Sequence, residues 1–318
     1  MTDQSASPPA LRCCVCDTPV FPPYNTLGQR VYCDHHFAVV NKPHAGFWRA
    51  GALQILVMGI FAIVVAGFSS LLADVSGSAL IGLGLLLAIA PTALWLWYFY
   101  TQDRLEPEPK TRIVLVFIVA LLLTDFFGRR LVYDWLRVPE WASVDTMTSL
   151  LASILIVGFT WQAIQYVAVR FVYASPEFDE RMDGIVYGTV AGLGVATLLN
   201  FYYILSNGGV ALAPGVIHVV TTSLAQASFG GLMGYFMAEA KFAHKPVWYV
   251  PLSYGLVAAL NGFFTWLIGE ISSAGLSVEP WRSLAMGVLV ALGAFGVLIY
   301  LMGRSTEVTL RRGAPGGQ

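Results

Sequence analysis

The chain has 318 residues, of which 57% are hydrophobic and only 12% are charged, and its net charge is -1. A soluble domain carries about 25% charged residues, so the composition excludes an ordinary soluble protein and predicts a polytopic membrane protein in a lipid bilayer. The near-neutral charge gives no sign of a basic surface, and we expect no nucleic-acid partner.

The first 45 residues are polar and contain no early apolar run, which predicts the absence of a signal peptide. Residues 1–10 are rich in Ser and Pro and predict a disordered tail. Residues 11–42 contain a C-x2-C pair, Cys13 and Cys16, and later a C-x2-H pair, Cys33 and His36. Two close pairs of sulfur and nitrogen ligands are typical of a tetrahedral zinc site. We therefore predict a small zinc-ribbon-like module whose folding depends on the metal.

The ligand choice in this module stays open. Cys14 and His35 each stand next to a predicted ligand, and either one is an alternative to its neighbour. Four protein ligands leave no open position on the metal, so the predicted role of zinc is structural. The other interpretation is a flexible tail with reduced thiols.

Long apolar runs separated by short polar joints fill the rest of the chain. Each is close to the roughly 20 residues that cross a bilayer. The predicted spans are residues 47–73, 79–100, 113–127, 147–172, 184–205, 214–238, 247–270 and 283–302. They predict an all-α membrane domain of about eight transmembrane helices over residues 46–303, followed by a cytosolic tail at 304–318. The mixture of Arg, Trp and Leu in residues 128–145 predicts a segment lying in the membrane interface.

The positive charges predict the orientation of these spans. Fourteen of the 18 Lys and Arg residues fall on the side that holds both termini, and four fall on the opposite side. Cytoplasmic loops carry the excess of Lys and Arg, which predicts a multi-pass protein of the cytoplasmic membrane with both termini cytosolic. Cytosolic thiols stay reduced and free to bind metal.

The fifth span has a distinctive start and a polar end. Asp183 is predicted to cap the helix N-terminus, and the loop acids before it are predicted to be solvated. Asn200 is an amide in an apolar segment, which needs a partner inside the bundle. Between them, small residues recur every four positions and predict close approach of a neighbouring helix. This ribbon consists of Gly184, Gly188, Gly192 and Ala196.

Two segments carry a family resemblance. Residues 182–194, MDGIVYGTVAGLG, are followed by an asparagine and tyrosines, and residues 100–110 read YTQDRLEPEPK. Both resemble the PrsW family of intramembrane proteases, relatives of the CAAX prenyl endopeptidases, and the resemblance covers residues 95–300. It implies an endopeptidase of single-span membrane proteins such as anti-sigma factors.

The resemblance also implies catalytic groups on the fourth to seventh spans, and this sequence departs from each of them. The family has Glu-Glu-x-x-Lys on the fourth span, Glu-Asn on the fifth and a histidine on each of the sixth and seventh. On the fourth span this chain has Trp161-Gln162 followed by Gln165, and on the fifth it has Leu199-Asn200. The sixth span carries Gln226 and the seventh carries Asn261 in place of the histidines. The resulting set of intramembrane amides is Gln162, Gln165, Asn200, Gln226 and Asn261.

An amide fills the volume of a carboxylate or imidazole but neither titrates nor activates water. The sequence therefore predicts a pseudoprotease with no catalytic residue and no cofactor in the membrane domain, which binds a transmembrane or membrane-associated partner without cleaving it. Three alternatives stay open: amides that only fasten helices, an active metallo- or glutamic-type endopeptidase, and a small-molecule channel or transporter. Asp125, expected to face Arg129 or Arg130, and His218 do not by themselves make a metal site.

Overall fold

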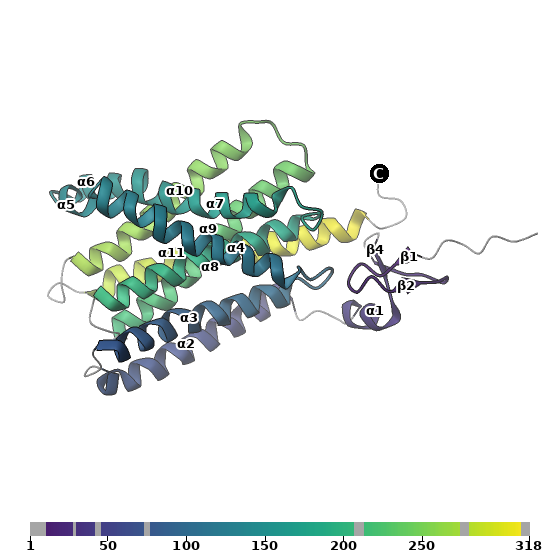
Figure 1. Ribbon diagram of the computed structural model, residues 1–318, viewed down its shortest axis with the longest axis horizontal. Coiled ribbons are helices and arrows are strands. Elements are labelled where there is room, and N and C mark those ends of the chain that lie inside the picture. Colours follow the sequence, from purple (N-terminus) through teal and green to yellow (C-terminus); the bar gives the residue numbers. More distant parts are fainter. Residues whose placement is uncertain are drawn as a thin grey trace, which may run out of the picture.

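The structure is a computed structural model, and it describes residues 11–27, 30–41, 46–72, 77–206, 213–273 and 280–312. A small module of strands and one short helix lies at one end of a long helical bundle (Figure 1). We call the end of the bundle next to this module the module face, and the opposite end the far face.

The module consists of two short hairpins and one helix. Strands β1 (Leu11–Arg12) and β2 (Pro19–Val20) pair antiparallel, as do β3 (Asn25–Leu27) and β4 (Arg30–Tyr32), with Thr26 opposite Val31. Helix α1 (Asp34–Val40) follows and buries none of its residues. Among the described residues of the module, Cys13 and Tyr32 are the buried ones. A core this small gives little stability of its own.

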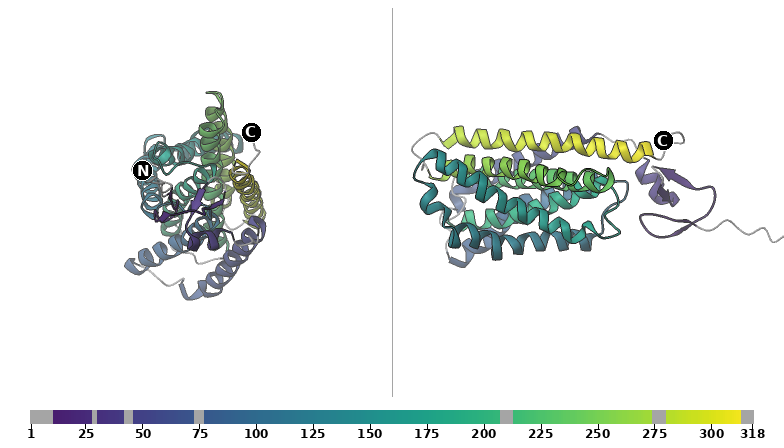
Figure 2. Two further views of the ribbon diagram at one scale, coloured as in Figure 1. Left: turned by 90° about the vertical axis from the view of Figure 1, so that its right-hand side faces the viewer. Right: turned by 90° about the horizontal axis from the view of Figure 1, so that it is seen from above.

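Eight helical spans in the described part of the chain are long and apolar enough to cross a membrane, which confirms the predicted all-α membrane fold. The elements are α2 (Phe47–Leu72), α3 (Gly77–Gln102), α4 (Lys110–Leu123), η1 (Thr124–Trp135), α5 (Val138–Ala142), α6 (Thr146–Ala152), η2 (Ser153–Gly158), α7 (Phe159–Tyr173), α8 (Arg181–Ser206), α9 (Ala213–Phe242), α10 (Tyr249–Ser273) and α11 (Pro280–Arg312). The last helix runs past residue 303 toward the module (Figure 2, right). Elements η1 and η2 are π-helices within longer spans.

The third span is longer than the sequence predicted. It continues from α4 through η1 and extends over Lys110–Trp135, so the first half of residues 128–145 is not a separate interface segment. Charged residues interrupt the apolar run there, but Asp125 and Arg129 pair with each other at 3.6 Å between carboxylate and guanidinium. This pair confirms the predicted contact and lowers the cost of placing the charges near the far face.

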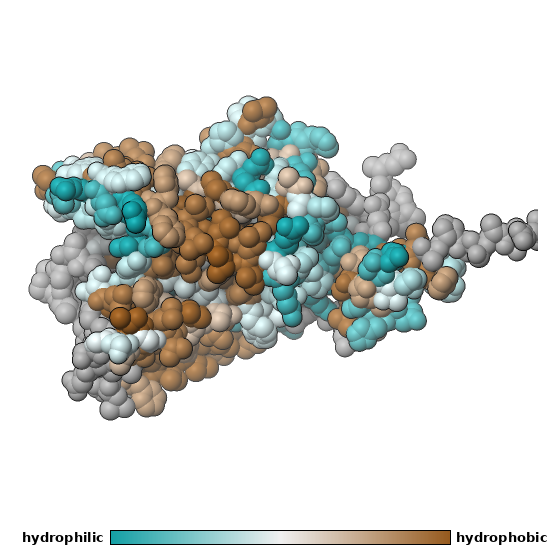
Figure 3. Space-filling model, in the orientation of Figure 1, coloured by the Kyte–Doolittle hydropathy of each residue, from teal (hydrophilic) through white to brown (hydrophobic). Residues whose placement is uncertain are grey.

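Helices α8 and α9 form the centre of the bundle. In each, 83% of the most apolar stretch is buried inside the protein, against 22–44% in the other spans. The surrounding spans expose apolar side chains as a hydrophobic band between more polar ends (Figure 3). Such a band is what a bilayer covers.

The predicted ribbon of small residues forms the contact between α8 and α9, which confirms its expected role. A Cβ added to any of its glycines would collide with a backbone carbonyl oxygen of α9. These contacts pair Gly184 with Gly234, Gly188 with Gly230, and Gly192 with Gln226. Small residues allow this approach because no side chain separates the two backbones.

The predicted N-cap at Asp183 is wrong in position. Helix α8 begins at Arg181, so Asp183 lies in the first turn and its carboxylate reaches back. It accepts hydrogen bonds from the backbone N–H groups of Asp179 (2.7 Å) and Glu180 (2.6 Å). Asp183 therefore caps the helix from its third position, as in a capping box.

Candidate functional site

Four of the predicted intramembrane amides meet at one point, which we call the amide centre: Gln162, Gln165, Gln226 and Asn261. Each is at most 1% exposed. The Gln165 Nε2 donates to Gln226 Oε1 at 2.7 Å, and Gln226 Nε2 donates to Asn261 Oδ1 at 2.9 Å. Asn261 Nδ2 donates in return to Gln226 Oε1 at 3.2 Å and to Gln162 Oε1 at 3.5 Å. The centre therefore links α7, α9 and α10.

Asn200 lies apart from the amide centre, although the sequence grouped it with the other four. Its Nδ2 donates to Val219 O and to Ser223 Oγ, both at 3.0 Å. These bonds tie α8 to α9. Its role in the structure is that of a fastener between the two central helices.

Close backbone contacts set the spacing of the amides. A Cβ on Gly158 would collide with the backbone of Gly262, and one on Gly262 would collide with that of Ser153. Gly262 directly follows Asn261, and Gly158 lies one helical turn before Gln162 at the end of the π-helix η2. Local π-helical turns are frequent at functional sites. Sequence reasoning missed both glycines, although their positions relative to the amides could have indicated them.

A cavity of about 430 Å³, which we call the far-face cavity, is lined by residues of η1, α7, α8, α9 and α10, including Gln226 of the amide centre. Its polar lining includes Tyr202, His218 and Thr222, and Trp161 is among its aromatic walls. The Thr222 hydroxyl is buried and has no hydrogen-bond partner. The cavity therefore offers the unsatisfied hydroxyl group of Thr222 to a ligand.

Charged side chains lie beside this cavity near the far face. Arg129 lines it, and the Arg129 guanidinium lies 3.4 Å from the centroid of the Tyr202 ring. The Tyr202 hydroxyl donates to Asp125 at 2.9 Å, and the rings of Tyr203 and His218 stack at 3.9 Å. His218 thus contributes an aromatic wall, and Asp125 is neutralised by Arg129.

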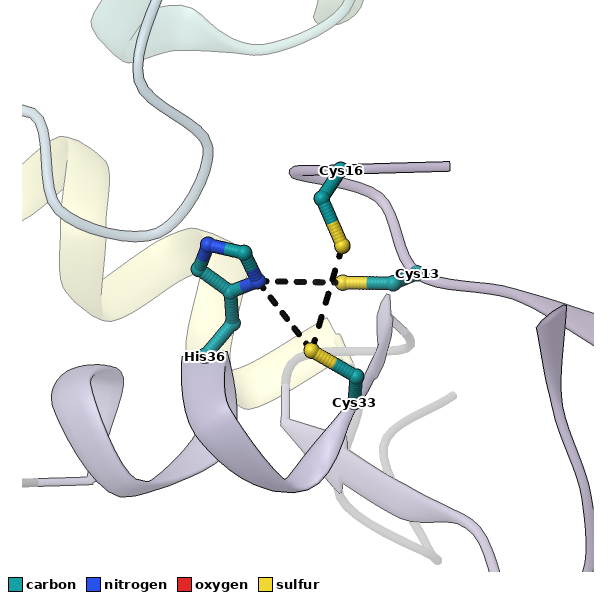
Figure 4. Close-up of side chains that lie close together, drawn as sticks. All are labelled: Cys13, Cys16, Cys33 and His36. Atoms are coloured by element: carbon teal, nitrogen blue, oxygen red, sulfur yellow. Dashed lines mark hydrogen bonds between the residues drawn. The ribbon is translucent and has the colours of Figure 1, made fainter. Parts of the chain in front are cut away.

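The module brings together the side chains that the sequence singled out as metal ligands (Figure 4). Cys33 and Cys13 lie 3.2 and 3.6 Å from His36 Nδ1, and Cys16 lies 3.9 Å from Cys33 between sulfurs. All four ligand atoms lie within 4.8 Å of one another. Within the described part of the chain, this is the single group of three or more His, Cys, Asp or Glu side chains arranged to hold a metal ion.

The alternative ligands Cys14 and His35 lie outside this group. Burial raises the pKa of the Cys14 thiol to about 12, which keeps it protonated. Burial also acts to raise the pKa of Cys13, but nearby backbone N–H groups outweigh it and lower that pKa to about 6. Metal ligation requires the thiolate, so Cys13 is better suited than Cys14.

Arg30 joins the module to the bundle. Its guanidinium lies 2.5 Å from a carboxylate oxygen of Glu106, 3.1 Å from Glu180 and 3.2 Å from Asp179. The side chain of Glu180 is only 6% exposed, so the expectation of a solvated acidic loop is wrong for this residue. Burial acts to lower the pKa of Arg30, but the three carboxylates outweigh it and raise that pKa.

Comparison of the sequence with known proteins points to one family. The model of the PrsW family intramembrane metalloprotease matches residues 109–294. Three curated relatives are each named Protease PrsW. The one from Geobacillus kaustophilus is 38% identical over 118 residues, which is 36% of this chain and 48% of the relative. That from Bacillus subtilis is 27% identical over 152 residues (47% and 65%), and that from Oceanobacillus iheyensis is 29% identical over 127 residues (40% and 56%).

The chain thus spans about half the length of the curated relatives it matches. No solved structure matches the chain significantly. The family description implies a metal, but the amide centre does not fit a hydrolytic metal site, because such sites are built from His, Cys and carboxylate ligands. The match covers more than half of the sequence, and it includes the amide-bearing helices. The chain therefore belongs to the PrsW family of intramembrane metalloproteases.

Proposed function

We propose that this PrsW-family protein is a pseudoprotease that binds a transmembrane or membrane-associated partner without cleaving it. The observation that carries the proposal is the amide centre, in which Gln162, Gln165, Gln226 and Asn261 hydrogen-bond mainly to one another. Peptide hydrolysis needs a base to activate water and an acid for the leaving amine. Side-chain amides supply neither near neutral pH.

The far-face cavity is the proposed binding site for the partner. Its apolar and aromatic walls suit the side chains of a membrane-embedded peptide, while the unpartnered Thr222 hydroxyl offers a hydrogen bond to a locally unwound backbone. The excess of Lys and Arg on the module face supports cytosolic termini and a cytoplasmic-membrane location. In that orientation the partner enters from the outer half of the bilayer.

The test is reconstitution of the full chain in nanodiscs with a fluorescent single-span reporter of the anti-sigma-factor type. We expect binding without cleavage. Thr222→Trp fills the cavity and should weaken binding at least about tenfold, whereas Leu289→Trp on the exposed face of α11 should not change it. Cleavage of the reporter that is lost in Gln226→Ala would instead establish an active endopeptidase.

We further propose that Cys13, Cys16, Cys33 and His36 bind one structural zinc ion. Their ligand atoms are close enough to share an ion, and the module has almost no core to fold without it. We expect about one zinc per full-length chain, lost in Cys16→Ala and retained in the matched control Cys14→Ala. Stoichiometric zinc in Cys16→Ala, measured by mass spectrometry of the purified protein, would overturn this assignment.

A further inference from the structure

A second cavity, of about 460 Å³, lies at the junction between the module and the bundle. Its walls are mostly apolar, and they come from the module, from α2, from the end of α3 and the loop after it, from α8 and from α11. They include Leu27, Val40, Leu105, Met182 and Leu310. Its polar lining consists of Asn41, Gln102, Asp103, Arg104, Glu180 and Thr306. We call it the junction cavity.

Three of these polar side chains present unpartnered acceptor atoms. Gln102, Asp103 and Glu180 are 8%, 3% and 6% exposed. Both carboxylate oxygens of Asp103, Gln102 Oε1 and Glu180 Oε1 are buried and have no hydrogen bond of normal geometry. The Nε2 of Gln102 already donates to Tyr98 O at 3.5 Å. Buried acceptors without a donor are costly, so the cavity favours a ligand that donates several hydrogen bonds.

Carboxylates outnumber the cations around the cavity, although Arg104 also lines it and donates to Val39 O at 3.2 Å. Burial, reinforced by the nearby carboxylates of Glu180 and Asp183, holds the pKa of Asp103 well above its usual value. The backbone N–H of Glu108 and the guanidinium of Arg30 offset only part of this shift. Arg30 is already shared among three carboxylates. A cation in the cavity would favour the ionised form of Asp103 and reduce this excess of negative charge.

The spacing of the acceptors argues for an organic cation over a metal ion. Within the described residues, the acids at the junction do not form a group of three ligands close enough to share a metal. An ammonium group has three donors, which matches three acceptor side chains spread around a cavity. The apolar walls would cover the stem that carries the ammonium group.

We propose that the junction cavity binds a primary ammonium group on a short apolar stem, with Asp103 as its charged partner and with Gln102 and Glu180 as further acceptors. This site lies at the opposite end of the bundle from the proposed partner-binding cavity, and it does not depend on the pseudoprotease proposal. The ammonium group can belong to a soluble amine or to an ethanolamine lipid headgroup.

The test measures the thermal unfolding midpoint of the full-length, zinc-loaded protein in phosphatidylcholine nanodiscs at pH 7.5, titrated with n-butylamine. Choline headgroups have no N–H donor and leave the acceptors free. We expect saturable stabilisation by n-butylamine and none by n-butanol, which has the same stem without the charge. In Asp103→Asn, the apparent affinity should fall at least about tenfold. The matched control Asp134→Asn removes an exposed acid on the far face and should behave as wild type.

A second variant separates loss of binding from loss of folding. Leu310→Trp fills the cavity without touching its acids, and it should abolish the response to n-butylamine while zinc content stays at the wild-type level. Equal effects of n-butylamine and n-butanol, or an unchanged response in Asp103→Asn, would overturn the proposal. Replacement of choline by ethanolamine lipids distinguishes the sources: a suppressed response identifies the headgroup as the ligand, and an unchanged response identifies a soluble amine.

Discussion

At the scale of single residues, the chain keeps an unusual number of carboxylates buried on the module face. Glu108 is 3% exposed and accepts a hydrogen bond from the Tyr187 hydroxyl. Burial and, second, the neighbouring Asp183 raise its pKa to about 10. At neutral pH Glu108 is therefore protonated in the folded protein, whereas in the unfolded chain it is ionised near its ordinary pKa of 4.5.

This difference predicts a pH-dependent stability. Between pH 4.5 and 10 the folded state holds a proton that the unfolded state has lost, so stability falls as pH rises, by at most about 1.4 kcal/mol per pH unit for this group. Glu108→Gln cannot titrate, yet its amide can accept from Tyr187 and donate to Asp183. We expect a higher unfolding midpoint above pH 7 and a shallower slope between pH 5 and 9. Glu140→Gln, at an exposed acid on the far face, is the control, and equal slopes in all three proteins would refute the assignment.

At the scale of helices, the contact between α8 and α9 positions the amide centre, because Gln226 lies where Gly192 meets α9. Gly188→Ala should destabilise the protein by about 1–3 kcal/mol, since the added methyl group has no space beside Gly230. Gly59→Ala on α2, where a Cβ meets nothing within 4 Å, should be neutral. The measurement is unfolding by denaturing detergent, and similar midpoints for the two variants would contradict this packing.

Much of the helix packing could be predicted from the sequence, because the spacing of small and polar residues along a helix indicates which face makes contacts. Glycines four apart predicted a close helix contact, although the spacing could not say that α9 was the partner. The length of the third span was mispredicted: the sequence indicated the contact between Asp125 and Arg129, but not that the helix continues past these charges to Trp135. Likewise, the sequence indicated the intramembrane amides but not which of them touch, and Asn200 was grouped with a centre that it does not join.

At the scale of the whole molecule, the module and the bundle are joined by contacts that the sequence did not indicate. Loop acids far apart in the chain look solvated in sequence, yet Arg30 gathers Glu106, Asp179 and Glu180 from two loops. The Tyr32 hydroxyl adds a hydrogen bond to Leu105 O at 3.0 Å. Arg30 and Tyr32 both lie in β4, the strand that ends directly before the metal-ligand candidate Cys33. Metal occupancy and docking of the module should therefore be linked.

Metal removal should consequently loosen the loops of the membrane domain. Removal of the proposed zinc ion takes away the main stabilising contribution expected for the module, so Arg30 and Tyr32 should no longer hold residues 103–109 and 175–180. We expect chelation to increase backbone hydrogen exchange in both segments. Arg30→Ala should show raised exchange even with zinc bound, whereas Arg12→Ala, which breaks an exposed ion pair within the module, should match wild type. If chelation unfolds the module while exchange in these loops stays unchanged, the junction contacts do not couple the module to the bundle, and the two parts act independently.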